Sequence, residues 1–197
     1  MCILLAFKSP SPNYDLIVIA NRDEFHSRDA APINFWNEKP HILGGRDLEA
    51  GGSWLAINKN GYLAAITNIS GGENAPKLPQ SRGSIVTEFL DGKKSSETYA
   101  ESLRDKHQNY NGFNLILYDG NTLYWDSNRS EKGKALSGKP YAISNTTPNH
   151  KWVKTEELKR SFGNALQGSS IGLQKRLLSI LGPKTRYEGT SSPLLME

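Results

Sequence analysis

Short apolar runs and polar turns alternate along the first part of the chain. Residues 2–7 (CILLAF) and 16–20 (LIVIA) are rich in aliphatic residues and show no 3.6-residue period, which is typical of buried strands. The linker between them is rich in Ser, Pro and Asn, so the two runs predict an antiparallel hairpin.

Two further hairpins are marked by turn residues. Lys59-Asn60-Gly61 and Asp119-Gly120-Asn121 each combine glycine with a residue that tolerates the positive φ angles of a tight turn. The predicted strands beyond the first hairpin are 53–58, 62–68, 113–119, 122–127, 140–145 and an edge or final strand at 191–196. The glycine-rich segments 44–47 and 51–54 precede a predicted strand, and their glycines are interpreted as letting the backbone pass close to a site.

Helical periodicity lies between and after these hairpins. Apolar residues at i, i+3 and i+4 spacing predict helices at 84–90, 96–105 and 173–181, with a shorter one at 155–162. The order is therefore four strands, two helices, three strands, two helices and a last strand. This order predicts an α+β fold in which helical layers enclose two sheets, although one mixed sheet covered on one face would also accommodate it.

Composition narrows the class of protein. The 197 residues, 37% of them hydrophobic, fit one domain spanning 1–197. A net charge of +4 is spread in ones and twos, which does not indicate a nucleic-acid partner. The N-terminal apolar run is too short for a signal peptide or for stable membrane insertion, so we expect a cytoplasmic protein. The sequence gives no signal that fixes the oligomeric state.

Metal and disulfide chemistry find no support. A single cysteine excludes an internal disulfide, and the four histidines are too widely separated for a typical metal site, so no metal is expected.

The single cysteine stands at position 2. Pairing Lys8 with Asp15 in the first hairpin brings Cys2 opposite Asn21 or its neighbours, so the thiol is expected to face the polar tetrad Asn21-Arg22-Asp23-Glu24.

A cysteine at this position has a specific chemistry. Methionine aminopeptidase removes Met1 before a small residue, and the α-amine of Cys2 can then act as general base for its own thiol. Arg22 could hold the thiolate or a substrate carbonyl, and Asp23 could orient the amine. Each residue also has a plainer interpretation: Cys2 as a small apolar residue that caps a strand, and Arg22 with Asp23 as a structural ion pair.

Two asparagines complete the candidate site. Asn68 and Asn145 each end a predicted strand, where a side-chain amide could stabilise an oxyanion, although asparagine at a strand end is most often a turn former.

Six motifs in order resemble the NRDE family. They are MCILLAF, ANRDEF, GGRDLEAGGSWLAINKN, GYLAAITN, SRG and YAISN. The family includes the eukaryotic transport and Golgi organisation protein 2, and the resemblance covers about three quarters of the chain by motif order. It implies the four-layer αββα fold of N-terminal-nucleophile hydrolases. It also implies Cys2 as nucleophile, Arg22 and Asp23 beside it, and Asn68 and Asn145 as oxyanion and amine-positioning residues.

The residues expected to line the pocket are Asn21, Glu24, Trp54 and Arg82. The chain departs from the family pattern at its C-terminal end, which is short. Where relatives carry a YGTRSS-like strand, this chain has TRYEGTSS, with Arg186 ahead of the tyrosine.

Two functions follow as hypotheses. One is an amide or thioester hydrolase, or an acyltransferase, that acts on a small apolar acyl compound through Cys2 and requires no cofactor. The other is a non-enzymatic carrier that uses the same pocket to bind haem or a lipid as cargo.

Overall fold

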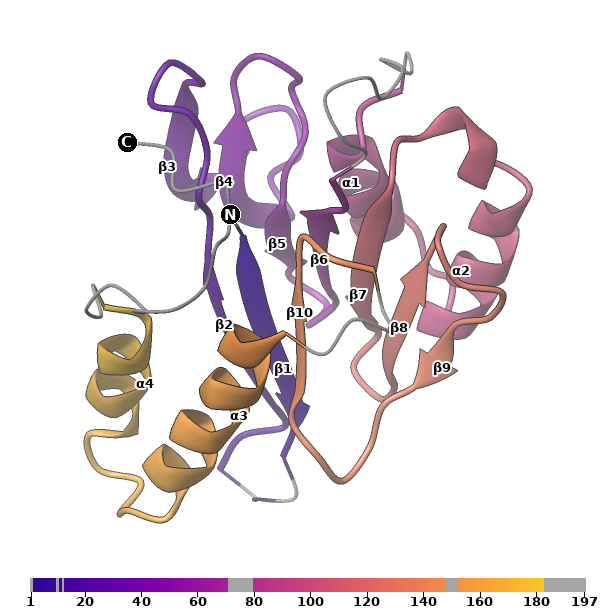
Figure 1. Ribbon diagram of the computed structural model, residues 1–197. Coiled ribbons are helices and arrows are strands. Elements are labelled where there is room, and N and C mark those ends of the chain that lie inside the picture. The colour runs from indigo at the N-terminus through magenta and orange to yellow at the C-terminus, as the bar shows by residue number, and fades with distance from the viewer. Residues whose placement is uncertain (1, 10, 12, 71–79, 148–151, 183–197) are drawn as a thin grey trace.

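The computed structural model describes residues 2–9, 11, 13–70, 80–147 and 152–182, which form two β-sheets flanked by helices (Figure 1). In chain order the elements are β1 (Ile3–Lys8), β2 (Leu16–Asn21), β3 (Ala30–Phe35), β4 (Ile42–Asp47), β5 (Leu55–Asn58), β6 (Leu63–Asn68), α1 (Gly83–Asp91), α2 (Ser96–Arg104), the 3-10 helix η1 (His107–Asn109), β7 (Phe113–Tyr118), β8 (Leu123–Ser127), β9 (Lys134–Ala135), β10 (Tyr141–Ser144), α3 (Val153–Leu166) and α4 (Leu173–Leu181).

Every strand pair within the two sheets is antiparallel. The small sheet has the order β10-β1-β2, so β1 is its central strand. The large sheet has seven strands in the order β3-β4-β5-β6-β7-β8-β9. Because β1 and β2 are joined by a short turn, the first hairpin forms as the sequence predicts, with Lys8 opposite Leu16 and not Asp15.

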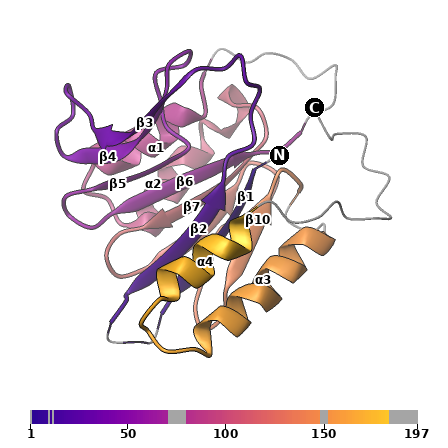
Figure 2. The same cartoon turned by 90° about the vertical axis from the view of Figure 1, so that its left-hand side faces the viewer.

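Three layers of buried side chains show how the sheets and helices stack. Along β1, Leu4 faces the large sheet and its neighbour Leu5 faces α3 and α4, as expected for alternating strand positions. Phe162 of α3 is fully buried in that outer layer, and burying such a ring stabilises the fold by about 2–3 kcal/mol. Figure 2 shows α3 and α4 lying across the small sheet.

The opposite face of the large sheet is covered by α1 and α2. Phe89 of α1 and Phe113 of β7 belong to this third layer of the core. The resulting order is helices, large sheet, small sheet, helices, which confirms the α+β class and the four-layer αββα sandwich. The single mixed sheet is therefore wrong.

Local turn chemistry explains the hairpins that the sequence predicts. Gly61, between β5 and β6, has φ of 82°, and Gly120, between β7 and β8, has φ of 87°. Both values lie in the left-handed region that favours glycine, so the Asn-Gly and Asp-Gly signals identify these turns correctly.

Three strands were not predicted, namely β3, β4 and β9. In β4, Gly44 and Gly45 look like loop residues but are required by close packing. A Cβ on Gly44 would lie 2.6 Å from the Cβ of Ala56, and one on Gly45 would lie 2.8 Å from the Trp54 ring. Strand β4 was missed because glycine is depleted in strands, whereas here close neighbours within the sheet require it.

Two other predictions differ in extent or cannot be compared. Helix α3 runs from Val153 to Leu166, which is longer than the predicted 155–162. The predicted strand at 191–196 and the divergent segment around Arg186 lie outside the described residues.

Among the helices that the structure describes, none is long and apolar enough to span a membrane.

Candidate functional site

The central strand β1 brings the start of the chain between two polar strand ends. Ile3 lies opposite Asn21 of β2 on one side and Ser144 of β10 on the other. Extending both registers by one residue sets Cys2 at the level of Arg22 and Asn145. Residues from three distant parts of the sequence therefore meet at one end of the small sheet.

The Cys2 thiol contacts the segment that follows β2. It is half-buried, and its sulfur donates a weak hydrogen bond to the main-chain oxygen of Asp23 at 3.8 Å. Burial raises the pKa of the thiol, and the carboxylates of Asp23 and Glu24 act in the same direction, whereas the contact with the Asp23 backbone lowers it. With these neighbours alone the sulfur is held mainly as the neutral thiol at pH 7.

Arg22 is oriented by an aromatic ring and two carboxylates. Its guanidinium lies 4.4 Å from the centroid of the Trp54 ring, and its Nη2 atom is 3.8 Å from Asp47 Oδ2 and 3.9 Å from Glu24 Oε2. Nη2 is buried and forms no hydrogen bond within the described part of the chain. Trp54 and Glu24, both expected to line a pocket, thus serve to hold Arg22.

Asp47 is a partner of Arg22 that sequence reasoning missed. Arg28 Nε donates to Asp47 Oδ2 at 2.8 Å, and the backbone N–H groups of Glu49 and Ala50 donate to Asp47 Oδ1. Burial alone would raise the pKa of Asp47, but these hydrogen bonds lower it below its ordinary value. The GGRD motif contained the residue, but only the fold brings it to Arg22.

Asn68 and Asn145 lie against each other where the two sheets meet. Asn145 Nδ2 donates to the main-chain oxygen of Asn68 at 2.8 Å, and the Ser70 N–H donates to the Asn145 main-chain oxygen at 3.2 Å. Asn145 Oδ1 is buried and accepts no hydrogen bond from any described residue. The Asn68 side chain is half-buried and forms no hydrogen bond within the described residues, so its amide is available as a donor.

Arg82 approaches the same place from the first turn of α1. It is the N-cap residue of that helix, and its Nη1 atom donates to the main-chain oxygen of Gly112 at 3.0 Å. Burial lowers the pKa of its guanidinium and the charge of Arg28 lowers it further, whereas Glu24 and the Cys2 thiolate act in the opposite direction. Arg82 is therefore within range of charge interaction with the sulfur.

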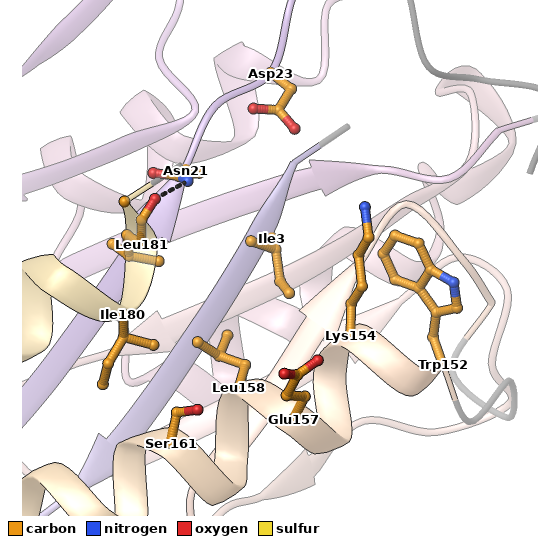
Figure 3. A pocket seen from close by; sticks show the side chains of 11 residues that line it. Ile3, Asn21, Asp23, Trp152, Lys154, Glu157, Leu158, Ser161, Ile180 and Leu181 are labelled. Carbon is orange, nitrogen blue, oxygen red and sulfur yellow. Dashed lines mark hydrogen bonds between the residues drawn. The ribbon is translucent and has the colours of Figure 1, made fainter. Parts of the chain in front are cut away.

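A cavity of about 190 Å³ opens on the α3 and α4 side of β1 (Figure 3). Its lining combines apolar side chains with polar ones: Ile3, Leu158, Ile180, Leu181, Trp152, Gly182, Asn21, Asp23, Lys154, Glu157 and Ser161. Asn21 also closes one wall, because its Nδ2 atom donates to the Leu181 main-chain oxygen at 2.9 Å. Of the nine residues that the sequence assigns to the site, Asn21 and Asp23 line this cavity, whereas Glu24, Trp54 and Arg82 are not among its described lining residues.

No described histidine joins the site. His26 is exposed, His41 pairs with Asp91 at 2.9 Å, and His107 lies 3.4 Å from Asp126. His150 lies outside the described residues. Over the described ranges, no group of three or more His, Cys, Asp or Glu residues has a metal-binding arrangement. The described residues therefore offer no histidine ligand for haem beside Cys2.

Comparisons with known proteins agree on one family. The family model for Transport and Golgi organisation 2 matches residues 1–192. The chain is 36% identical to the Transport and Golgi organization protein 2 homolog of Homo sapiens over 185 residues, covering 86% of this chain and 66% of the relative. It is 30% identical to Transport and Golgi organization protein 2 of Drosophila melanogaster over 214 residues, covering 95% of this chain and 74% of the relative.

The chain thus spans slightly less than two thirds of the length of the human relative, and the Mus musculus homolog, at 34% identity, gives the same 66% coverage. A solved structure, the Caenorhabditis elegans N-acylethanolamine-hydrolyzing acid amidase ortholog, matches with a TM-score of 0.56 and 10% identity. The match covers 93% of this chain and 86% of that one. At this identity the likeness shows the fold, which is that of N-terminal-nucleophile hydrolases.

Proposed function

Because the chain belongs to the Transport and Golgi organisation 2 family and has the N-terminal-nucleophile hydrolase fold, we propose that it is a cysteine hydrolase or acyltransferase. It acts on an amide or thioester of a small apolar acyl group and uses Cys2 as its nucleophile. The observation that carries the proposal is the position of Cys2, which lies in register between Arg22 and Asn145 with its sulfur against Asp23.

Activation of the thiol requires removal of Met1. The pKa of the thiol is raised by burial, so a neutral sulfur is a poor nucleophile at pH 7. Once Cys2 is the first residue, its α-amine is bonded to the same Cα and can accept the thiol proton. The resulting ammonium lies next to the thiolate and stabilises it by charge. We assign the carboxylate of Asp23, whose main-chain oxygen contacts the sulfur, to hold that ammonium.

The chemical steps then follow from the positions of the asparagines. The thiolate attacks the acyl carbonyl carbon, and the carbonyl electron pair moves onto oxygen to form a tetrahedral oxyanion. Asn68 is the better donor to this oxyanion, since the Asn145 amide nitrogen already donates to the Asn68 main chain. Collapse of the intermediate expels the amine or thiol, which takes the proton from the Cys2 ammonium and leaves an S-acyl enzyme. Water or an acceptor nucleophile then releases the acyl group.

Asn145 has a separate part in this scheme. Its buried Oδ1 atom accepts no hydrogen bond from the described residues, and leaving such an acceptor unpaired costs about 1–3 kcal/mol. The Cys2 ammonium is at the same register level and can donate to it. We assign Asn145 to positioning the amine and Asn68 to the oxyanion.

The carrier hypothesis has weaker support. The described cavity of about 190 Å³ is smaller than the roughly 300–1,000 Å³ of typical ligand pockets, which is a poor fit for haem. The proposed reaction needs no resident cofactor, because the nucleophile and the base come from one residue. The chain has one cysteine, which is compatible with a protein that acts in a reducing compartment such as the cytoplasm.

The test compares two forms of the full chain. One is released from a cleavable N-terminal extension so that Cys2 is its first residue, and the other keeps the extension uncut. Both are incubated with short-chain acyl nitrophenyl esters and acyl thioesters, and the intact mass is followed with time. We expect an acyl adduct on the released form and a rate at least tenfold lower on the uncut form.

Single-residue variants of the released form test the roles proposed for Cys2, Asp23 and Asn68. Cys2→Ala should form no adduct, and Asp23→Asn should form it more slowly. Asn68→Ala should lower the acylation rate by about 10²–10³ through loss of an oxyanion donor. Absence of any adduct across the panel in the released form would contradict the proposal. A saturable spectral change on titration with hemin, retained in Cys2→Ala, would then support the carrier instead.

A further inference from the structure

Among the described residues, Arg82 differs from Arg22 and Arg28 in forming no ion pair with a carboxylate. Arg22 and Arg28 both pair with Asp47, at 3.8 and 2.8 Å. Arg82 forms no such pair within the described residues, although it is half-buried. A guanidinium that has lost part of its hydration and has no directly paired carboxylate is an energetic cost to the fold, which an anionic ligand would offset.

The backbone holds Arg82 rigidly in this position. A Cβ on Gly52 would lie 2.6 Å from the main-chain carbon of Gly83, so this backbone contact requires glycine at position 52. The Ser53 N–H also donates to the Gly83 main-chain oxygen at 3.4 Å. The segments 51–53 (GGS) and 81–83 (SRG) therefore pack closely against each other. Their contact fixes the start of α1, where Arg82 lies.

One hydrogen bond aims the guanidinium at the candidate site. Arg82 Nη1 donates to the Gly112 main-chain oxygen, which also accepts from the Ile69 N–H at 2.8 Å. Ile69 directly follows Asn68, whose main chain binds Asn145. The guanidinium thus lies at the edge where Asn68 and Asn145 meet, and this bond uses one of its five N–H donors.

We propose that Arg82 is a specificity-determining residue that binds an anionic group, a carboxylate or a phosphate, on the acyl compound that reacts at Cys2. This inference rests on the proposed function and extends it from a small apolar acyl group to one attached to an anion. The planar fork of donors in arginine matches both kinds of oxyanion. The charge of Glu24 acts on Arg82, but Glu24 forms no direct ion pair with it within the described residues, so it does not occupy the guanidinium donors.

The single cysteine permits a direct test without a known substrate. The released chain is alkylated with neutral iodoacetamide and with anionic iodoacetate, and both rates report on Cys2 alone. The iodoacetamide rate reports the thiolate fraction and its access, whereas the ratio of iodoacetate to iodoacetamide isolates attraction for the anion. We expect Arg82→Met to lower this ratio about fivefold, as a lost charge interaction at short range in water predicts.

Arg46→Met is the control. It removes an arginine of β4 that is ion-paired with Glu38, so the ratio should change less than about twofold. Arg82→Lys keeps the charge but loses the fork, and its ratio should fall between those of the parent chain and Arg82→Met. A ratio that stays the same in Arg82→Met and Arg82→Lys would overturn the proposal.

Inorganic phosphate provides a measurement that needs no variant to fold. Phosphate should slow iodoacetamide alkylation of the parent chain in a saturable way, whereas sodium chloride at equal ionic strength should not. Protection by acetate but not by phosphate would assign the site to carboxylates, and equal protection by all three salts would contradict a specific anion site. Alkylation requires no turnover, so a failure to form an acyl enzyme leaves this test intact and would count against the proposed function alone.

Discussion

Two arginine and carboxylate clusters of the molecule are built very differently. The Asp126 cluster consists of Asp126, Arg104 and His107, and it joins β8, α2 and η1. Asp126 has 0% of its side chain exposed, with Oδ1 2.7 Å from Arg104 Nη2 and Oδ2 3.4 Å from His107 Nε2. The Asp47 cluster consists of Asp47, Arg22 and Arg28 beside Cys2, and its arginines are 18% and 31% exposed.

The difference separates a structural cluster from a functional one. In the Asp126 cluster the carboxylate is fully buried and lies close to Arg104, whose side chain is 27% exposed, and the single cysteine of the chain lies elsewhere. In the Asp47 cluster Arg22 keeps a longer separation from its acid and stacks on Trp54, so its guanidinium stays available at the side of the thiol. Within the described residues, both clusters contain buried polar atoms that form no hydrogen bond, namely Asp126 Oδ2 and His107 Nε2 in one and Arg22 Nη2 in the other. The feature that distinguishes the Asp47 cluster is therefore its position next to the segment that contacts the Cys2 thiol.

The largest effect on stability is expected in the buried cluster. Asp126→Asn removes the carboxylate that both Arg104 and His107 approach, and breaking a buried pair on one side should lower the free energy of unfolding by about 3 kcal/mol. Urea unfolding measures this change. Asp91→Asn, which breaks the exposed pairs with Lys39 and His41, is the control and should cost about 0–1 kcal/mol. Equal losses in the two variants would remove the distinction between buried and exposed clusters.

A smaller effect is expected from the glycine contact that frames the Asp47 cluster. The Gly52 main-chain oxygen accepts from the Asp47 N–H at 2.9 Å, and a Cβ there would clash with Gly83. Gly52→Ala should therefore lower the free energy of unfolding by about 1–3 kcal/mol through overpacking, and it should also change the alkylation ratio of Cys2. Thermal unfolding and alkylation are the two readouts.

Gly163 of α3 offers a matched glycine-to-alanine substitution, which is expected to raise the free energy of unfolding where Gly52→Ala lowers it. A Cβ at this helical position meets nothing within 4 Å, and its φ is not in the left-handed region. Gly163→Ala should raise the free energy of unfolding by about 0.5–1 kcal/mol and leave the alkylation ratio unchanged. A stabilised Gly52→Ala would show that the contact with Gly83 is not tight.

A small, pH-dependent effect is expected from Asp47 itself. Its pKa is lowered in the folded protein, so its contribution to stability is present above the unfolded value near 3.8 and is lost as the pH falls through the lower folded value. Asp47→Asn should cost about 1 kcal/mol at pH 7 and flatten the decline of stability as the pH falls below the unfolded value.

Asp119 serves as the reference for this pH dependence. Its pKa is also lowered, by backbone N–H groups of Thr122, Ser96 and Asn121 that outweigh the effect of burial, and it lies away from the site. Asp119→Asn should flatten the same part of the profile without changing Cys2 alkylation. If Asp47→Asn also left alkylation unchanged, the Asp47 cluster would have no influence on the thiol.

Local signals made much of the fold predictable from the sequence. Glycine turns at Gly61 and Gly120 fixed two hairpins, and the short first linker fixed the approximate register that brings Cys2 to Arg22. Strand β3 was missed because it is an edge strand with Pro32 and mostly exposed residues, so it lacks an alternating apolar pattern.

The contacts that build the site were less predictable. Asn68 and Asn145 were identified as strand ends, but their hydrogen bond depends on how two sheets stack, which periodicity does not encode. The pairing of Arg22 with Asp47 joins residues 25 positions apart on different sheets. The position of Arg82 depends on the contact between Gly52 and Gly83, which only the packed backbone reveals.

The central claim is that the processed amino terminus activates the Cys2 thiol, and the pH dependence of its alkylation tests this most directly. Iodoacetamide rates are measured from pH 5 to pH 10 for the chain that begins at Cys2 and for the same chain with its extension uncut. We predict a lower apparent thiol pKa in the released chain, because its ammonium stabilises the thiolate, and a raised pKa in the uncut chain, because burial dominates there. Superimposable profiles for the two chains would contradict the account.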